Sequence, residues 1–387
     1  MIHKFFGIKT EQRQGLYKAF CALPKIIKNP LINIACWIGR HQIKSFSTPP
    51  RLIWYVTSRC NARCSHCFYG RHINQKDEFT IDEFKRVVRS LDTKLRAVNL
   101  TGGEPFLHGD LPELCRTLAE ISKTDLITLP TNGSKPASIE LSLQKILKTA
   151  KLRVNVQVSL EGTRDVHDQI CGIYGIFDNA VETVQRLKKL KSHYKRLNNI
   201  SVITTLSLQN EKCLSELMRF VREELGVFHK IQFIRGAHTD VFGIELCDLS
   251  ELDPLHPEKP HDIVGVVNFL SRDILRYNKT LLARKQIELL YQAASILTNK
   301  KPSVNCLAGR IDGVIFANGD VAICELTKPF ANLRDFSFDF HKLWNSSQAN
   351  EMRRRTQKCF CTHPCNLTTS MSFDPHILKK LSVEYIL

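Results

Sequence analysis

Three cysteines in one short segment are the residues best suited to chemistry. The stretch CNARCSHC places Cys60, Cys64 and Cys67 four and three residues apart. A closed zinc site takes four ligands, and His66 is a poor fourth ligand because it adjoins Cys67 in the chain. A cubane iron–sulfur cluster held by three thiolates leaves one iron open to a further ligand. The spacing therefore favours an iron–sulfur cluster that binds a chelating ligand.

A glycine-rich stretch after the second strand-like run suits such a ligand. In TGGEP, Gly102 and Gly103 let the backbone approach closely, and the carboxylate of Glu104 can accept hydrogen bonds from an ammonium group. Two further turns, TNG at 131–133 and SLEG at 159–162, follow the next two runs. Because the chemistry of parallel barrels lies at the carboxyl ends of their strands, we expect these turns on the same rim as the cysteines.

Five more cysteines follow residue 300. The sequence predicts a hairpin over 313–324 that turns at Asn318-Gly319, a compact way to place Cys306 and Cys324 on one cluster. The spacings suit a second iron–sulfur cluster, and a zinc site with four cysteine ligands is the alternative. The five residues are Cys306, Cys324, Cys359, Cys361 and Cys365.

The segments between these motifs alternate between strand-like and helical patterns. Each connection is long enough for a crossover, which predicts parallel strands in right-handed βαβ units. Six units make an incomplete barrel, so the predicted fold class is α/β, a partial (β/α)6 TIM-like barrel with a small C-terminal iron–sulfur domain. The expected strands are 51–57, 96–101, 126–130, 152–160, 200–208 and 229–236, and the expected helices are 80–91, 110–122, 138–149, 177–191, 211–225, 262–276, 280–298 and 341–355.

The length of 387 residues suits more than one domain. We expect four consecutive segments, divided by their motifs. They are a basic N-terminal extension at 1–50, the barrel at 51–240, a helical linker at 241–305 and the auxiliary cluster domain at 306–387.

Charge is concentrated near the N-terminus. The formal net charge is +17, and residues 1–51 hold nine Lys or Arg against one acid, Glu11. The mixture of basic and apolar residues at 15–44 suits either a contact with a membrane surface or a helix packed on the outside of the barrel. No run reaches the roughly 18 apolar residues of a spanning helix, and no signal peptide is recognisable. We expect a cytoplasmic protein, with membrane association as a further expectation.

Together the motifs resemble those of the radical S-adenosylmethionine (SAM) superfamily over roughly residues 51–236. Cys60, Cys64 and Cys67 match its cluster motif, and Gly102-Gly103-Glu104-Pro105 matches its second motif. The resemblance implies that the three cysteines bind a [4Fe–4S] cluster whose open iron is chelated by SAM. It also implies reductive cleavage of SAM to a 5′-deoxyadenosyl radical, which abstracts a hydrogen atom from the substrate.

The same resemblance assigns roles to the turns. The residues expected to bind the cofactor are Gly102, Gly103, Glu104, Pro105, Asn132, Ser159 and Glu161. In SLEGTRDVHDQICG, His167 and Asp168 fit the family pattern, whereas Cys171 stands where an arginine is expected. A capped turn at a helix start is the structural alternative for His167 and Asp168. The candidates for a catalytic role are Asp168, Cys171 and Glu325.

The late cysteines resemble the auxiliary-cluster extensions called SPASM and twitch. Five cysteines suffice for one cluster, which favours the shorter twitch type. Cys306, Cys324 and Cys365 are the expected ligands, and the fourth is either Cys361 or Cys359.

The expected function is that of a radical SAM enzyme acting on a peptide or protein. A dehydrogenase or epimerase of sugars, nucleotides or lipid-linked small molecules is one alternative, and a non-catalytic iron–sulfur electron carrier is another. The implied partners are SAM and an external flavodoxin- or ferredoxin-like electron donor. Nucleic acid is not expected as a partner, because the basic excess lies at the N-terminus and no RNA-binding module is recognisable.

Overall fold

The computed structural model describes residues 19–76, 78–235, 259–299, 301–355 and 361–382. These form two compact units, each built from separate segments of the chain. We call them the barrel unit, with the described residues of 47–261 and 308–356, and the terminal unit, with those of 19–46, 262–307 and 357–387. The four consecutive segments expected from the motifs divide the chain differently, and their boundaries stay a prediction.

A nine-stranded sheet organises the barrel unit, with the order β6-β5-β4-β3-β2-β1-β7-β8-β9. The first six strands pair in parallel, each with its successor in the chain, as a partial TIM-like barrel requires. This confirms the predicted fold class and all six predicted strands. The six are β1 (Arg51–Thr57), β2 (Ala97–Gly102), β3 (Leu126–Thr131), β4 (Arg153–Ser159), β5 (Leu197–Leu206) and β6 (Phe228–Phe233).

The late hairpin joins this same sheet. Its first strand β7 (Asp312–Ile315) pairs in parallel with β1, and β8 (Asp320–Ala322) and β9 (Ala331–Asn332) follow antiparallel. The predicted turn is confirmed, since the amide of Gly319 donates to the carbonyl of Phe316. The single helix predicted over 341–355 is wrong: α12 (Phe340–Trp344) and α13 (Ser347–Arg355) are separated at Asn345.

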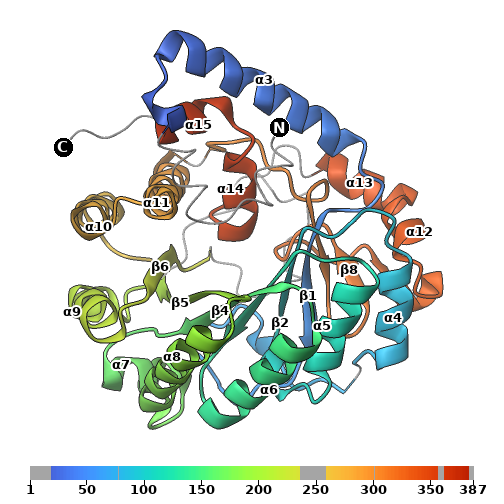
Figure 1. Cartoon of the computed structure of the whole chain (residues 1–387), viewed down its shortest axis with the longest axis horizontal. Coiled ribbons are helices and arrows are strands. Elements are labelled where there is room, and N and C mark those ends of the chain that lie inside the picture. Colours follow the sequence, from blue (N-terminus) through green and yellow to red (C-terminus); the bar gives the residue numbers. More distant parts are fainter. Residues whose placement is uncertain (1–18, 77, 236–258, 300, 356–360, 383–387) are drawn as a thin grey trace. The chain divides into compact units, whose positions relative to one another are not determined.

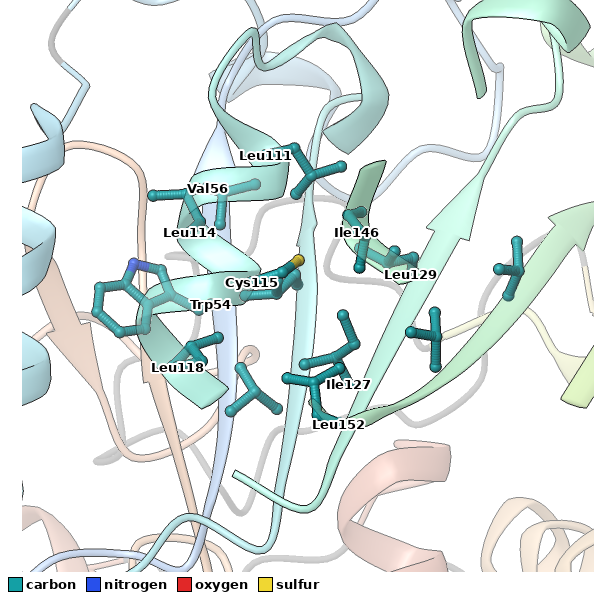
Figure 2. Packing of buried hydrophobic residues seen from close by; sticks show 14 of the residues in the cluster. Trp54, Val56, Leu111, Leu114, Cys115, Leu118, Ile127, Leu129, Ile146 and Leu152 are labelled. Atoms are coloured by element: carbon teal, nitrogen blue, oxygen red, sulfur yellow. The ribbon is translucent and has the colours of Figure 1, made fainter. Parts of the chain in front are cut away.

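Amphipathic helices cover one face of the sheet (Figure 1). Trp54 of β1 stacks on Phe84 with 4.2 Å between ring centroids, and the buried aliphatic side chains around Cys115 continue this core (Figure 2). Burial of this area supplies the main driving force for the fold. The helices are α4 (Ile81–Arg89), α5 (Leu111–Glu120), α6 (Pro136–Thr149), α7 (Arg164–Cys171), α8 (Ile176–His193) and α9 (Leu214–Phe220), the last continued by a π-helical turn over Val221–Leu225.

Alternation along the strands leaves polar side chains on the other face. In β4, Val154, Val156 and Val158 are buried, whereas the alternate positions are less buried and polar, as a period of two residues requires. The alternate residues are Asn155, Gln157 and Ser159 in β4, and Asn99 and Thr101 in β2. The concave face of the partial barrel therefore suits a polar ligand.

The terminal unit is helical in its described residues. Helix α3 (Lys25–Lys44) packs along α15 (Pro375–Leu381), and α11 (Leu281–Asn299) contacts both α10 (Ile263–Tyr277) and α14 (Pro364–Met371). This confirms the two helices predicted over 262–276 and 280–298. Among the described helices, none is long and apolar enough to cross a bilayer.

Candidate functional site

The three-cysteine loop begins directly after β1. Cys60, Cys64 and Cys67 are free and half-buried thiols. In a reverse turn, the amide of Cys67 donates to the carbonyl of Cys64 at 3.1 Å. Asn74 Oδ1 accepts from the amide of Cys60 at 3.0 Å. One of these bonds is within the loop backbone and the other is to a nearby side chain, so local structure positions the cysteines.

The C-terminal end of α7 supports this loop from outside. The carbonyl oxygens of Cys171 and Ile170 accept from the amides of Arg63 and Ser65, at 3.1 and 2.9 Å, on either side of Cys64. The buried Cys171 thiol also donates a hydrogen bond to the sulfur of Cys64, which lowers the pKa of the Cys64 thiol. The residue that departs from the family pattern is thus a direct neighbour of a predicted cluster ligand.

The pKa values of the other two thiols, Cys60 and Cys67, are raised rather than lowered. Burial raises the pKa of Cys60, and burial together with the neighbouring Cys64 raises the pKa of Cys67 to about 11. Iron binds thiolates, so these two cysteines release protons when a metal cluster binds.

Two glycines bring the end of β2 against the same loop. The amide of Gly103 donates to Thr57 O at 2.9 Å, and the amide of Glu104 donates to Arg59 O at 2.7 Å. A Cβ atom on Gly102 would lie 2.0 Å from Thr57 O, and one on Gly103 would lie 2.2 Å from Arg59 O. Only glycine allows this approach, and Gly102 also has a left-handed φ of 141°.

Glu104 follows the two glycines and is buried, with 3% of its surface exposed. Its carboxylate accepts from Asn132 N at 2.7 Å, Thr131 Oγ1 at 2.9 Å and Phe106 N at 3.1 Å. Burial raises the pKa of Glu104 to about 7, and these bonds oppose the rise. A carboxylate has about four acceptor positions, so one is left for a ligand donor. Pro105 is buried and begins the short helical turn that follows.

Asn132 connects Glu104 to the cysteine loop. Its side-chain amide donates to Asn61 Oδ1 at 3.0 Å, and Asn61 in turn donates to Ser134 Oγ at 2.9 Å. Asn61 lies between two of the cysteines in sequence, yet nothing in its spacing marked it as part of the site. Thr131, a further partner of Glu104, belongs to the TNG turn and could have been singled out with Asn132.

The end of β4 reaches the loop from the other side. Glu161 is buried, accepts from Thr205 N at 2.7 Å and lies 3.7 Å from His66 Nε2 in the cysteine loop. Burial raises the pKa of Glu161 to about 8. Ser159 is half-buried at the end of the strand. Sequence reasoning considered His66 only as a metal ligand and missed its contact with Glu161.

Asp168 and His167 of α7, which fit the family pattern, make structural contacts. The carboxylate of Asp168 accepts from the amides of Gly175 and Phe177 at 2.6 and 2.9 Å, at the start of α8. His167 is fully buried and accepts from the Glu161 amide through Nδ1 at 2.9 Å. Burial lowers the pKa of His167 to about 4, which keeps the ring neutral. These contacts fit the capped-turn alternative, and a catalytic role for Asp168 stays a prediction.

Glu325 joins the site through two residues that the sequence did not single out. It is buried after β8, accepts from the Tyr55 hydroxyl at 2.5 Å and lies 3.4 Å from the Arg235 guanidinium. The Arg235 guanidinium in turn lies 3.8 Å from the ring centroid of Phe68, the residue after Cys67. Glu325 therefore acts on the cysteine loop through Arg235 and Phe68.

Comparison with known proteins agrees with this arrangement. Residues 54–221 match the family model of the Radical SAM superfamily. The chain contains a radical SAM domain. Fe-coproporphyrin III synthase of Methanosarcina barkeri is 30% identical over 194 residues, which are 49% of this chain and 46% of that protein. The chain thus spans about half the length of such a curated relative.

Other similarities extend beyond the radical SAM domain. The subtilosin biosynthesis protein AlbA of Bacillus subtilis is 24% identical over 343 residues, covering 84% of this chain and 67% of that protein. Two solved structures share the fold. SuiB of Streptococcus suis bound to its precursor peptide SuiA has a TM-score of 0.53 at 16% identity, covering 83% of this chain and 70% of that one. The anSMEcpe complex with AdoMet and the Cp18Cys peptide has a TM-score of 0.54 at 14% identity, covering 86% and 98%.

The radical SAM site fits the cofactors of its superfamily by the chemistry of its donors. Three free thiols supply one ligand fewer than the four irons of a cubane cluster, and the buried Glu104 carboxylate beside them keeps one acceptor position for a ligand donor. The residues that would hold the cluster are Cys60, Cys64 and Cys67, and the residues next to SAM would be Gly102, Gly103 and Glu104.

The late cysteines are divided between the two units. In the terminal unit, Cys306 and Cys361 line a small cavity of about 20 Å³, and Cys365 lies on the first turn of α14. Cys324 is buried after β8 in the barrel unit, and Cys359 lies outside the described residues. The ligand set of a second cluster, and the choice between Cys359 and Cys361, stay predictions.

Proposed function

We propose that this protein is a radical SAM enzyme that abstracts a hydrogen atom from a peptide or protein substrate. The observation that carries the proposal is the contact of the two motifs: the Gly103 and Glu104 amides bond to Thr57 and Arg59 at the base of the cysteine loop. When bound, the reduced cluster supplies the electron that cleaves SAM and starts hydrogen-atom abstraction.

The chain's own residues would bind and orient the cofactor. The close backbone contact at Gly102 and Gly103 places Glu104 beside the cysteine loop. There the fourth acceptor position of the Glu104 carboxylate would accept a hydrogen bond from the ammonium group of SAM. Ser159 and Glu161, at the end of β4, would hold the ribose. Because Glu104 is held by three hydrogen bonds, it needs no rearrangement when the ligand arrives.

A peptide substrate is supported by the extent of the similarities. AlbA, SuiB and anSMEcpe align with 83% to 86% of this chain, beyond the radical SAM domain. One of these proteins is named for bacteriocin biosynthesis, and the other two were solved with a bound peptide. We propose a second [4Fe–4S] cluster held by Cys306, Cys324, Cys365 and one of Cys359 and Cys361.

We also propose an external electron donor of the flavodoxin or ferredoxin kind and a peripheral contact with a membrane. The donor is supported by the charge of the segment 58–76, which has no acid and exposes Arg59, Arg63, Arg71 and Lys76. An acidic donor would be attracted to this segment next to the cluster cysteines.

The test is the formation of 5′-deoxyadenosine from SAM by reconstituted protein under dithionite. We expect the product from wild type and from Cys36→Ala, whose cysteine is buried in α3, and none from Cys64→Ala. Absence of the product from fully loaded wild type would contradict the proposal and favour an electron carrier. Mass loss or cross-linking of a peptide substrate, measured by mass spectrometry, then tests the substrate class.

A further inference from the structure

Helix α3 presents an apolar face that nothing in the described residues covers. Its buried stripe consists of Lys28, Ile32, Cys36, Gly39 and Ile43. At 100° per residue, the exposed apolar side chains fall within an arc of about 140° on the opposite side of the helix. They are Ile26, Ile27, Leu31, Ile34, Trp37 and Ile38, with exposed fractions from 37% to 82%.

The orientation of α3 is fixed by polar contacts within the terminal unit. The buried Lys28 Nζ donates to the carbonyls of Cys21 and Ser382 at 2.9 and 3.0 Å. Near the other end of the helix, Arg40 Nε donates to Phe373 O at 3.0 Å. Because a buried ammonium without these partners would be costly, the helix cannot rotate its apolar face inward. The outward face is therefore a stable feature of the unit.

The charge of this region selects the partner. Helix α3 contains no acidic residue, and residues 1–51 hold nine Lys or Arg against Glu11. A second copy of the chain would bring the same charge, with a total of +17, and would be repelled. A bilayer with anionic headgroups offers both an apolar layer and negative charge, and amphipathic basic helices with an exposed tryptophan suit that interface.

We propose that α3 lies in the surface of an anionic membrane, with Ile26, Leu31, Ile34 and Trp37 among the acyl chains and Lys44 at the headgroups. Lys44 is exposed and borders the apolar arc at the C-terminal end of the helix. The inference specifies the membrane contact of the proposed function, and it is independent of the radical chemistry because no α3 residue belongs to the cofactor site.

Tryptophan fluorescence tests the proposal on the whole protein. Trp54 and Trp344 are buried and Trp37 is 66% exposed, so a change on binding reports on α3. With vesicles of equal phosphatidylcholine and phosphatidylglycerol, we expect co-sedimentation and a shift of the emission to shorter wavelength. We expect weaker binding in high salt and with phosphatidylcholine alone.

Matched double variants distinguish binding through the α3 face from nonspecific binding through other exposed apolar residues. Leu31→Asn with Ile34→Asn leaves Trp37 in place and should weaken vesicle binding about tenfold or more, since two apolar side chains no longer enter the bilayer. Leu141→Asn with Tyr174→Asn removes two exposed apolar residues of the barrel unit, which are 55% and 98% exposed, and should change nothing. Both variants should form 5′-deoxyadenosine as wild type does, and thermal unfolding checks their folding.

Three results would overturn the proposal. The first is wild type that does not bind the anionic vesicles, and the second is equal weakening by both double variants. The third is Trp37 emission, taken as the difference between wild type and Trp37→Phe, that is already that of a shielded indole before vesicles are added, which would mean that the chain or a second copy covers the face. Failure of 5′-deoxyadenosine formation with intact vesicle binding would instead contradict only the proposed enzyme.

Discussion

The Tyr55 hydroxyl donates a 2.5 Å hydrogen bond to Glu325 Oε1, which connects the first strand of the barrel to the segment after β8. Both side chains are buried, and the other carboxylate oxygen lies 3.4 Å from Arg235. Since Arg235 stacks on Phe68 next to Cys67, one buried carboxylate organises groups from β1, the end of β6 and the cysteine loop.

Replacing Glu325 should therefore destabilise the barrel unit. We expect Glu325→Gln to lower the free energy of unfolding by about 2 kcal/mol, because the largely buried Arg235 guanidinium would no longer face a negative charge. Chemical denaturation measures this. The control is Glu351→Gln, which breaks a surface pair with Arg354 and should cost at most about 1 kcal/mol. Equal losses of unfolding free energy for the two variants would show that the buried pair contributes no more to stability than the surface pair does.

A methyl group at Gly103 should disturb the cysteine loop. The added Cβ would lie 2.2 Å from the Arg59 carbonyl, so the backbone leading to Cys60 must move. We expect Gly103→Ala to lose most of the iron that wild type binds after reconstitution and to lose about 1–3 kcal/mol of stability. Gly109→Ala, where no atom lies within 4 Å of the added Cβ, should keep both. Full iron loading of Gly103→Ala would contradict the close approach.

The buried Glu104 should make stability depend on pH. Its pKa is raised from 4.5 to about 7, so between these values the folded protein holds a proton that the unfolded chain releases. The stability this adds is complete below pH 4.5 and is lost as the pH rises through 7, a change of about 3 kcal/mol. Urea unfolding between pH 5 and 8 should show a falling free energy for wild type and a flatter line for Glu104→Gln. Glu161, with a pKa raised to about 8, keeps a residual slope of the same sign. Parallel lines for the two proteins would refute the assignment.

Cys171 should tune the cluster rather than bind it. Its thiol donates to the Cys64 sulfur, and removing a donor from a cluster ligand makes the cluster harder to reduce. We expect Cys171→Ala to keep the iron content of wild type and to shift the reduction potential to more negative values, measured by electron paramagnetic resonance during a redox titration. Cys36→Ala should leave the potential unchanged. Loss of iron in Cys171→Ala would instead indicate a ligand.

The sequence predicted the strands and the rim well, because both depend on local patterns. Alternation and crossover length identify β1 to β6, and the motif residues follow from their places after strands. Contacts between turns could not be predicted, since pairs such as Asn61 with Asn132 or Arg235 with Glu325 are far apart in the chain and have no shared pattern. Helix α7 was missed because its eight residues are too few for a clear helical period and were interpreted as a turn.

The central claim is that SAM binds the open iron of a cluster held by Cys60, Cys64 and Cys67. Electron paramagnetic resonance of the reduced, reconstituted protein before and after addition of SAM tests it most directly. We predict a reduced [4Fe–4S] signal that changes when SAM is added, and no such response in Cys64→Ala. A wild-type signal that is identical with and without SAM would contradict the claim.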